Sequence, residues 1–266
     1  MEAAKAGGPF SAAGTTFVLL HGFAQTPRSW DAVADALRAG GAEVLVPDLY
    51  ACVSPFSMDE ACAFLEKAVR LAACEKAHGP VVAGYSMGGR IALETLARVH
   101  DLPVAALVLE GAGLGPADEA AREAFRVRGE RWARELREGG VDAFMDRWEA
   151  LPLFATQRRL PASSRACVRA DRVAHGAEEL AASCERAGQH CQASEDASLA
   201  ALAHAAARGV RIVYVHGRSD GKYGGVAQRV ARRVPAARVV GVAGAGHNVH
   251  LERPEAVARV LADAVG

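Results

Sequence analysis

Three residues of this 266-residue chain have the side chains that nucleophilic and acid–base catalysis require, and they occur in the order Ser86, Asp220, His247. A serine hydroxyl is a poor nucleophile and a poor base until a neighbouring group accepts its proton. His247 could accept that proton, while Asp220 could hold the imidazole in the required tautomer and stabilise its cation. Any one of these residues alone would more commonly be a helix cap or a solvated loop residue. Together they predict a Ser–His–Asp triad.

Ser86 lies between an apolar run that ends at Gly84 and an apolar-periodic helix that begins directly after the serine. The segment Gly84-Tyr85-Ser86-Met87-Gly88 has the G-x-S-x-G pattern in the strand–turn–helix setting of a nucleophile elbow. Such a turn is so tight that glycine is needed at its flanking positions, and it displays the serine at the positive end of a helix. The pattern indicates that Ser86 is displayed for chemistry.

Six short apolar segments have the length and composition of buried strands. They cover residues 16–20, 43–46, 81–84, 104–109, 210–215 and 237–242. Helical segments alternate with them, at 29–37, from a capping box at 57–60 towards Ala77, from 86 to about 99, and from about 254 onwards. This alternation predicts an α/β fold with a mostly parallel sheet and helices on both faces. Because the loops after parallel strands gather at one edge, the three triad residues are expected to meet there.

Residues 111–208 break this rhythm, since they are helical, rich in arginine and glutamate, and show no buried-strand pattern. The α/β alternation resumes at residue 209. We therefore predict an α/β core of residues 1–110 and 209–266, with a helical lid of residues 111–208 inserted over the carboxyl edge of the sheet. An independent helical domain is the alternative, which the return of the α/β rhythm disfavours.

A triad that acts on a carbonyl compound also needs donors for the negative oxygen that develops in the substrate. The expected donors are the backbone N–H of Met87, directly after the serine, and that of Phe23, in the turn after the first predicted strand. The His21-Gly22 pair in that turn is expected to shape the backbone and not to transfer protons.

The composition limits the kinds of partner. Lys plus Arg and Asp plus Glu each total 31, so the formal net charge is zero and neither nucleic acid nor a membrane surface is the expected partner. Residues 1–14 lack the apolar region of a signal peptide, and no apolar run reaches the length of a membrane span. We therefore expect a cytoplasmic protein, while the oligomeric state is not indicated.

The six cysteines are scattered and form no C-x-x-C motif, which favours buried thiols in a reducing compartment. Cys184, His190 and Cys191 could be imagined as metal ligands, but their spacing matches no common zinc site. Neither a metal nor a cofactor is expected.

The triad order and the serine turn resemble the α/β-hydrolase superfamily over the whole chain outside the lid. More narrowly, the sequence is similar to the MenH-type 2-succinyl-6-hydroxy-2,4-cyclohexadiene-1-carboxylate synthases. The segments that carry this similarity are 20–23 with Trp30, 84–90, Trp148 with 151–155, Asp220 with Lys222, and 246–254. The resemblance implies a lyase of menaquinone biosynthesis. Such an enzyme takes a proton from 2-succinyl-5-enolpyruvyl-6-hydroxy-3-cyclohexene-1-carboxylate and eliminates pyruvate without an acyl-enzyme.

The resemblance also implies that core and lid side chains bind a small-molecule polycarboxylate. The implied substrate-binding residues are Tyr85, Arg90, Arg126, Trp148, Arg172 and Lys222. Guanidinium groups suit this task because they pair with carboxylates through two parallel hydrogen bonds. Among the lid arginines, Arg122, Arg128 or Arg169 could replace Arg126 or Arg172. Trp148 could instead belong to the lid core, and Tyr85 could merely pack.

Two other functions remain open. An ordinary serine hydrolase, either an esterase or a carbon–carbon bond hydrolase, would use the same triad. A catalytically inactive binding module is disfavoured by the intact set of Ser86, Asp220 and His247. An arginine-lined pocket would favour the lyase, because it suits a polyanion better than a neutral ester.

One segment departs from the family pattern. After Pro47-Asp48-Leu49 the family usually continues with a glycine-histidine-glycine turn and a serine, whereas this chain continues with Tyr50-Ala51-Cys52-Val53-Ser54. The loop is therefore expected to follow a different path, and no substrate contact can be carried over to it.

Overall fold

The computed structural model describes residues 2–3, 10–74 and 78–265. Within these residues, seven strands form one sheet in the order β1-β7-β6-β5-β4-β2-β3, and every neighbouring pair is parallel. The strands are β1 (Glu2–Ala3), β2 (Thr16–Leu20), β3 (Glu43–Leu45), β4 (Val81–Tyr85), β5 (Ala106–Glu110), β6 (Arg211–Gly217) and β7 (Arg238–Val242). The predicted α/β fold with a parallel sheet is confirmed.

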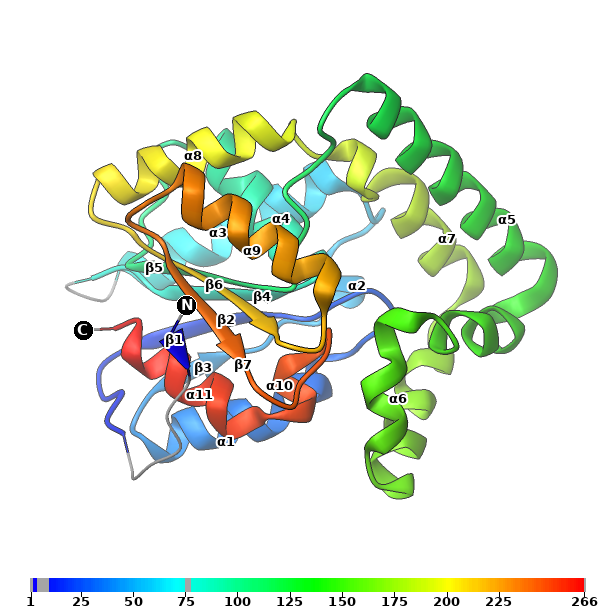
Figure 1. Cartoon of the computed structure of the whole chain (residues 1–266), viewed down its shortest axis with the longest axis horizontal. Coiled ribbons are helices and arrows are strands. Elements are labelled where there is room, and N and C mark those ends of the chain that lie inside the picture. Colours follow the sequence, from blue (N-terminus) through cyan, green and yellow to red (C-terminus); the bar gives the residue numbers. More distant parts are fainter. Residues whose placement is uncertain (1, 4–9, 75–77, 266) are drawn as a thin grey trace.

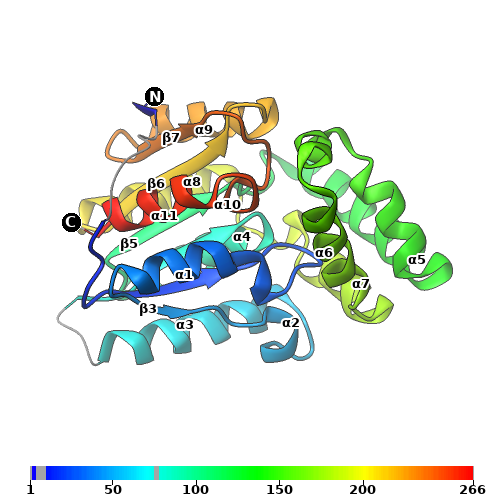
Figure 2. The same cartoon turned by 90° about the horizontal axis from the view of Figure 1, so that it is seen from below.

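Helices cover both faces of the sheet, so that it forms the middle of three layers (Figures 1 and 2). One face carries α3 (Met58–Cys74), α4 (Met87–Arg98), α8 (Glu195–Ala207) and α9 (Gly221–Arg233). The other carries α1 (Asp31–Ala39) and α11 (Pro254–Asp263), which pack on each other. Because both faces are covered, all residues of β2, β4 and β5 are buried, and these strands read as continuous apolar runs.

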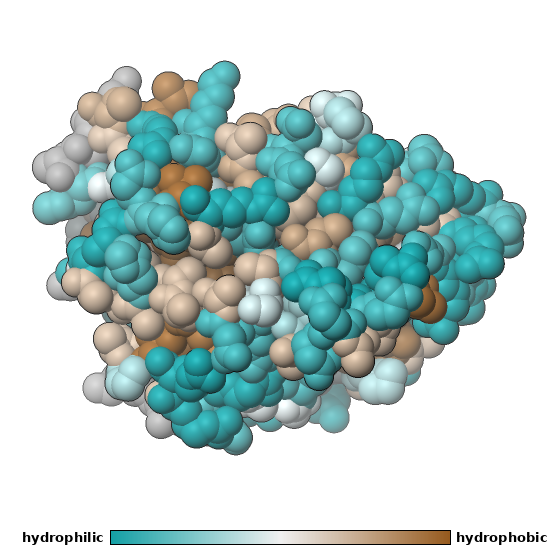
Figure 3. All heavy atoms as spheres, turned by 90° about the horizontal axis from the view of Figure 1, so that it is seen from above, coloured by the Kyte–Doolittle hydropathy of each residue, from teal (hydrophilic) through white to brown (hydrophobic). Residues whose placement is uncertain are grey.

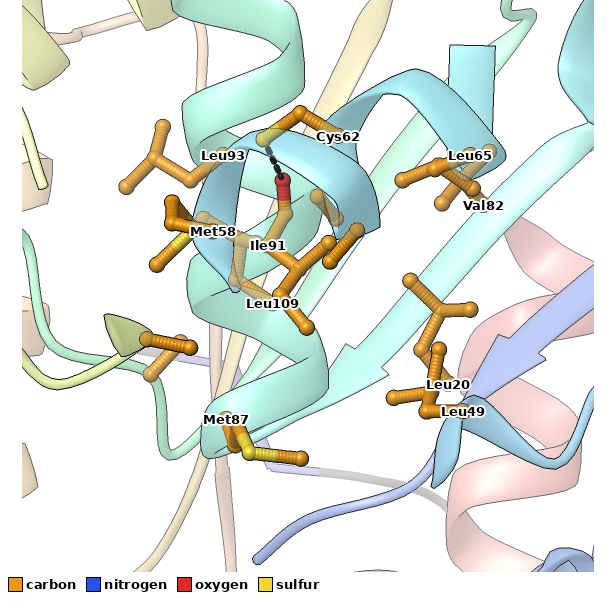
Figure 4. Close-up of a cluster of buried hydrophobic side chains, with 14 of the residues drawn as sticks. Leu20, Leu49, Met58, Cys62, Leu65, Val82, Met87, Ile91, Leu93 and Leu109 are labelled. Atoms are coloured by element: carbon orange, nitrogen blue, oxygen red, sulfur yellow. Dashed lines mark hydrogen bonds between the residues drawn. The ribbon is translucent and has the colours of Figure 1, made fainter. Parts of the chain in front are cut away.

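Each face of the sheet has its own apolar core. On the α4 side, Leu65 of α3 and Ile91 of α4 pack over Leu20 and Leu109 of the strands (Figure 4). The opposite core includes Trp30, which is 1% exposed. Burying one leucine or isoleucine side chain stabilises the fold by about 1.5–3 kcal/mol. This packing fixes the strand ends from which the candidate site loops emerge.

A helical cap, defined here as residues 117–194, lies beyond the carboxyl ends of the strands (Figures 1 and 2). It consists of α5 (Glu119–Glu149), η2 (Pro152–Arg159), α6 (Ala162–Val173), α7 (Ala177–Arg186) and η3 (Gln189–Cys191). α5 packs mainly along α7 and is interrupted at Gly140, whose φ is 75°. The two ends of the cap meet, since the N–H of Glu195 donates to the carbonyl of Pro116 at 2.9 Å.

The segment expected to form the lid, residues 111–208, therefore has two parts. Residues 117–194 form the cap, whereas α8 packs on α4 and β6 and belongs to the layer that covers the sheet. Sequence periodicity did not separate these parts because both are helical.

Strand boundaries differ from expectation by a few residues. β5 begins at Ala106 and not at residue 104, because residues 102–104 form a turn in which the Val104 N–H donates to the Leu102 carbonyl at 3.0 Å. β6 continues to Gly217, where it still pairs with Val242 of β7. The two-residue strand β1 was not predicted.

Helix starts follow local capping. At the expected capping box, the Glu60 N–H donates to the Ser57 hydroxyl at 3.2 Å. The expected end of this helix near Ala77 lies outside the described residues. The remaining short elements are η1 (Pro27–Trp30), α2 (Leu49–Cys52) and α10 (Val249–Glu252).

The face viewed from above is mainly hydrophilic, with scattered hydrophobic spots (Figure 3). Among the helices that the structure describes, none has both the length and the apolar character needed to cross a bilayer.

The expectation of buried thiols holds for Cys62 and Cys184 but is wrong for three others, which lie on exposed helix positions. The exposed cysteines are Cys52, Cys74 and Cys167.

Candidate active site

The turn between β4 and α4 displays Ser86 in a backbone conformation that few side chains adopt. Its φ is 50° and its ψ is −103°, so the residue lies in the sparsely populated left-handed region. A Cβ atom on Gly84 would approach the Gly88 carbonyl carbon to 2.5 Å, and one on Gly88 would approach the Leu20 oxygen to 2.4 Å. Both contacts are too short for a side chain, which explains why glycine flanks the serine.

The three residues predicted as a triad meet at the carboxyl edge of the sheet. His247 Nδ1 lies 3.0 Å from Asp220 Oδ2, and His247 Nε2 lies 3.4 Å from the Ser86 hydroxyl oxygen. Because a carboxylate only accepts, Nδ1 carries the proton, and Nε2 is left to accept from serine. The arrangement can generate a basic or nucleophilic serine oxygen.

Asp220 is fixed by the helix that follows it. Its Oδ1 atom accepts the N–H of Tyr223 at 3.1 Å, so the carboxylate caps α9 with one oxygen and binds His247 with the other. The Tyr223 ring stacks on the His247 imidazole with ring centroids 4.6 Å apart. Burial raises the pKa of Tyr223 to about 12, so it remains a neutral phenol beside the histidine.

Glu110, the last residue of β5, connects the two halves of the triad. Its main-chain oxygen accepts the Ser86 N–H at 2.9 Å. Its buried carboxylate accepts the N–H groups of Val249 and His250 at 2.7 and 3.1 Å, just after His247. The same oxygen lies 2.9 Å from His250 Nδ1. One residue therefore fixes both the serine turn and the histidine loop.

The turn after β2 brings Phe23 to the serine. Phe23 and Met87 both line the cavity beside Ser86, as expected for residues whose N–H groups would face a negative oxygen. His21 Nδ1 donates to the Gly22 carbonyl at 2.9 Å, and the Gly22 N–H donates to the Gln25 side-chain oxygen at 2.8 Å. His21 thus shapes this turn, and within the described residues it forms no hydrogen bond with His247.

A cavity of about 310 Å³ lies between the triad and the cap. Its apolar wall is aromatic and comes mostly from the cap. The aromatic residues that line it are Phe23, Tyr85, Phe125, Trp132, Trp148, Phe154 and Tyr223. Trp148 serves in both roles considered for it, because it lines the cavity and also packs on Phe23 and Trp132 with ring centroids 5.0 and 4.9 Å apart.

Tyr85 lies between the triad and the core. Its ring centroid is 5.1 Å from that of His247 and 4.9 Å from that of His250. Burial raises the pKa of Tyr85 well above its usual value, so its hydroxyl stays protonated and can donate to a ligand in the cavity that it lines.

Four cationic side chains line the same cavity: Arg90, Arg128, Arg172 and Lys222. Arg90 donates to the Ala187 carbonyl at 2.7 Å, and Arg128 donates to the Gln189 side-chain oxygen at 2.7 Å. Within the described part of the chain, no carboxylate forms an ion pair with Arg90, Arg128 or Lys222. Arg172 differs, because it donates to Glu149 at 2.9 Å and to Gln157 at 3.2 Å.

The unpaired cations affect one another. Burial lowers the pKa of Lys222, and the positive charges of Arg128 and Arg90 lower it further. Burial also lowers the pKa of Arg90, and the charge of Arg128 acts in the same direction. An anionic ligand would raise both pKa values again, because it would supply the opposite charge that stabilises the protonated side chains. The cavity is therefore suited to negatively charged ligands.

The structure corrects the expected position of one lid arginine. Arg126 does not appear among the residues that line the cavity in the described chain; it is paired with Glu123 and Glu130 along the exposed side of α5. Arg128, two residues later, faces the cavity and lies over the Phe125 and Trp132 rings. Residues two apart lie about 200° apart around a helix, so only one of the two can face inward.

Several residues of the site were not identified from the sequence. Glu110 ends an apolar strand and looked like a strand terminus, and Gln25 lies in a loop with no motif. Tyr223 could have been found, because it is in the first helical turn after Asp220 and therefore next to the triad.

In the described residues, no group of three or more His, Cys, Asp or Glu side chains is arranged to hold a metal ion.

A family model described as the alpha/beta hydrolase family matches residues 17–260. The chain belongs to the alpha/beta hydrolase family. Its fold agrees with this assignment, as does the arrangement of Ser86, Asp220 and His247 in the loops after β4, β6 and β7.

Curated relatives of this family member share one name. A Bacillus subtilis (strain 168) protein, named as a candidate 2-succinyl-6-hydroxy-2,4-cyclohexadiene-1-carboxylate synthase, is 30% identical over 71% of this chain and 66% of its own length. The synthase of that name from Salmonella newport (strain SL254) is 33% identical over 67% of this chain and 65% of its own length. The matched segment thus spans just under two thirds of each relative.

Solved structures show the same fold. MenH from S. aureus has a TM-score of 0.81 at 22% identity and covers 95% of this chain and 94% of its own. A malate-bound thermophilic esterase from Thermogutta terrifontis has a TM-score of 0.74 at 24% identity and covers 95% and 90%. Identities this low establish a shared architecture and leave the reaction to be argued from the site.

Proposed function

We propose that this protein is a carbon–oxygen lyase of menaquinone biosynthesis, working in the cytoplasm. Its substrate would be 2-succinyl-5-enolpyruvyl-6-hydroxy-3-cyclohexene-1-carboxylate, and its products 2-succinyl-6-hydroxy-2,4-cyclohexadiene-1-carboxylate and pyruvate. The observation that carries this proposal is the set of unpaired cations, Arg90, Arg128 and Lys222, in the cavity that Ser86 and His247 line. The names of the curated relatives support it.

The proposed reaction begins with removal of the proton at ring carbon 2, which lies α to the succinyl ketone. Ser86 takes this proton and passes its own to His247 Nε2, while Asp220 stabilises the imidazolium. The electron pair moves onto the ketone oxygen. We expect the N–H groups of Phe23 and Met87, which line the cavity beside Ser86, to donate to that oxygen.

The second half of the reaction breaks the bond between ring carbon 5 and the ether oxygen. The electron pair returns from the enolate oxygen, a double bond forms between carbons 2 and 3, and the former 3,4 double bond moves to carbons 4 and 5. Enolpyruvate leaves with the ether electrons and tautomerises to pyruvate after it takes a proton from His247. Atoms balance without water or a covalent enzyme intermediate.

The cavity charge matches the proposed substrate. The substrate carries three carboxylates: on the ring, at the end of the succinyl chain and on the enolpyruvyl group. Arg90, Arg128 and Lys222 supply three positive charges that form no ion pair with a protein carboxylate in the described chain. Arg172 is already balanced by Glu149, so its contribution would be a directed hydrogen bond more than net charge.

A serine hydrolase is the second candidate, favoured by the intact triad and by the fold shared with the Thermogutta terrifontis esterase. It requires the serine oxygen to attack a carbonyl and a water to enter afterwards. The charged cavity disfavours neutral esters, since the three cations that line it would face an apolar ligand without a counter-charge.

Pyruvate release tests the proposal. Purified protein is mixed with the enolpyruvyl substrate, and pyruvate is followed by NADH oxidation with lactate dehydrogenase. Short-chain p-nitrophenyl esters are assayed in parallel. We expect rapid pyruvate release and slow ester hydrolysis. Rapid ester turnover without pyruvate release would reject the lyase and support the hydrolase.

The two neighbouring cap arginines provide a matched test of the binding site. Arg128→Ala is expected to raise KM for pyruvate release about tenfold or more. A hydrogen bond to a charged group contributes about 1.5–3 kcal/mol, and about 1.4 kcal/mol corresponds to a factor of ten. Arg126→Ala removes the same charge from the exposed side of α5 and should leave KM within about twofold. Equal effects of the two substitutions would show that Arg128 acts only through long-range charge.

A further inference from the structure

The turn that carries Phe23 is held on both sides by residues 49 and 50. On one side, the Leu49 N–H donates to His21 Nε2 at 3.0 Å, and His21 Nδ1 donates to the Gly22 carbonyl. On the other side, the Ala24 N–H donates to the Tyr50 hydroxyl oxygen at 3.2 Å. The peptide groups before and after Phe23 are thus both tied to the segment in which the chain departs from the family pattern.

This turn requires such support. Ala24 has a φ of 52°, a left-handed conformation that is unfavourable for a residue with a Cβ atom. Strained residues of this kind persist only where surrounding contacts hold them. In the described structure, the N–H group of Ala24 is held by its hydrogen bond to the Tyr50 hydroxyl oxygen.

Tyr50 is itself fixed in place. Asp48 caps the short helix α2 by accepting the Tyr50 N–H at 3.0 Å. The Tyr50 ring is buried against Phe56 and His175, with centroids 4.8 and 4.7 Å apart. Burial raises the pKa of Tyr50 well above its usual value, so its hydroxyl keeps its proton.

That proton points towards the cap. The Ser183 hydroxyl lies 3.3 Å from the Tyr50 oxygen and donates its own proton to the Leu180 carbonyl at 2.8 Å. Because a hydroxyl has one proton, Ser183 must accept from Tyr50. A directed chain of hydrogen bonds therefore runs from Ala24 N–H through Tyr50 and Ser183 to Leu180 in α7. The Met87 sulfur, 4.0 Å from the Tyr50 oxygen, is a second and weaker acceptor for the Tyr50 hydroxyl and lies beside the second expected donor.

We propose that Tyr50 is a positioning residue that sets the Phe23 N–H for the negative oxygen formed in the reaction and links this N–H to the docked cap helix α7. Tyr50 does not appear among the residues lining the cavity within the described chain, so it acts through the turn and not on the substrate. The proposal rests on the proposed function only in requiring a reaction that builds negative charge on oxygen. Ester hydrolysis and serine phosphonylation share this requirement.

Tyr50→Phe tests the proposal because it removes the hydroxyl and keeps the ring. We expect kcat for pyruvate release to fall about tenfold with KM within about twofold, which is less than the 10²–10³ loss typical of removing an oxyanion donor outright. The rate at which a fluorophosphonate labels Ser86, followed by mass spectrometry, should fall by the same factor. Unchanged kcat and labelling in the folded variant would overturn the proposal.

The labelling arm separates this proposal from the proposed function. If the wild-type protein labels but releases no pyruvate, the lyase assignment fails, while the effect of Tyr50→Phe on labelling still decides the role of Tyr50. Phe56→Leu serves as the packing control, because it loosens the Tyr50 ring without removing a hydrogen bond. It should lower Tm without slowing labelling. Equal slowing in both variants would reduce Tyr50 to a packing residue.

Ser183→Ala tests the link to the cap. It should slow labelling about threefold, because the phenol loses its acceptor but keeps Ala24. Ser183 also lines the cavity, so the double variant decides whether it acts through Tyr50 or on the ligand. On this proposal Tyr50→Phe/Ser183→Ala should be no slower than Tyr50→Phe alone. If the two factors multiply instead, the chain of hydrogen bonds does not transmit the effect.

Discussion

Replacing Ser86 with alanine is expected to lower kcat for pyruvate release about a thousandfold while leaving product affinity within about twofold. The reason is that the hydroxyl is the group placed between His247 and the substrate, and positioned general bases contribute about 10²–10⁴ to rate. Product binding should survive because the unpaired cations that attract it are untouched. Pyruvate release gives kcat, and isothermal titration with the product gives affinity.

Two comparisons make the Ser86 result interpretable. Ser11→Ala changes an exposed serine near the start of β2 and should match the wild type in both measurements. Ser86→Ala should also lose all fluorophosphonate labelling. Retained pyruvate release in Ser86→Ala would show that another group removes the proton, and His247 would then be the base.

Arg90→Ala is expected to have the largest effect on substrate binding, raising KM about thirtyfold with kcat changed less than about threefold. Arg90 lies one turn beyond Ser86 in α4, and its guanidinium is held by the Ala187 carbonyl without a carboxylate partner in the described chain. A hydrogen bond to a charged group contributes about 1.5–3 kcal/mol, and a guanidinium can bind a carboxylate through two such bonds.

Arg90→Lys distinguishes charge from geometry. Lysine keeps the positive charge but loses the planar fork, so its KM should lie between those of the wild type and Arg90→Ala. Raising the salt concentration should weaken the wild type little, because this charge is in the cavity and poorly screened. A normal KM for Arg90→Ala would remove Arg90 from the proposed binding residues.

The fold and the triad could be predicted because they depend on local patterns. Buried parallel strands read as apolar runs, and the loops after them gather at one edge, so Ser86, Asp220 and His247 had to meet there. The glycines at 84 and 88 gave the serine turn its signature, and the structure shows which contacts exclude a side chain at each.

The choice between Arg126 and Arg128 could not be made from the sequence. α5 carries arginine and glutamate on most of its sides, so no apolar stripe identifies its inner face. A two-residue error in aligning a polar helix exchanges its inner and outer faces. The role of α8 was equally hidden, because helical periodicity does not tell whether a helix covers a sheet or a cavity.

Most of the other site features that could not be predicted from the sequence depend on long-range hydrogen bonds. Glu110 serves both triad loops and Tyr50 supports the Phe23 turn, yet each bond joins residues far apart in sequence. No local pattern encodes such a pair. From the sequence, the departure from the family pattern at Tyr50 indicated only that the loop follows a different path. The structure shows in addition that the Tyr50 hydroxyl accepts a hydrogen bond from Ala24.

The meeting of the two ends of the cap at Pro116 and Glu195 makes the cap a removable module of the fold. A chain that leaves and re-enters the core at one point imposes no length or shape on the sheet, whatever it does in between. Closing a loop costs only slightly more free energy as the loop grows. Caps of different size and charge can therefore be joined to the same sheet, and substrate choice can change above the same triad as long as α7 keeps its contact with Tyr50.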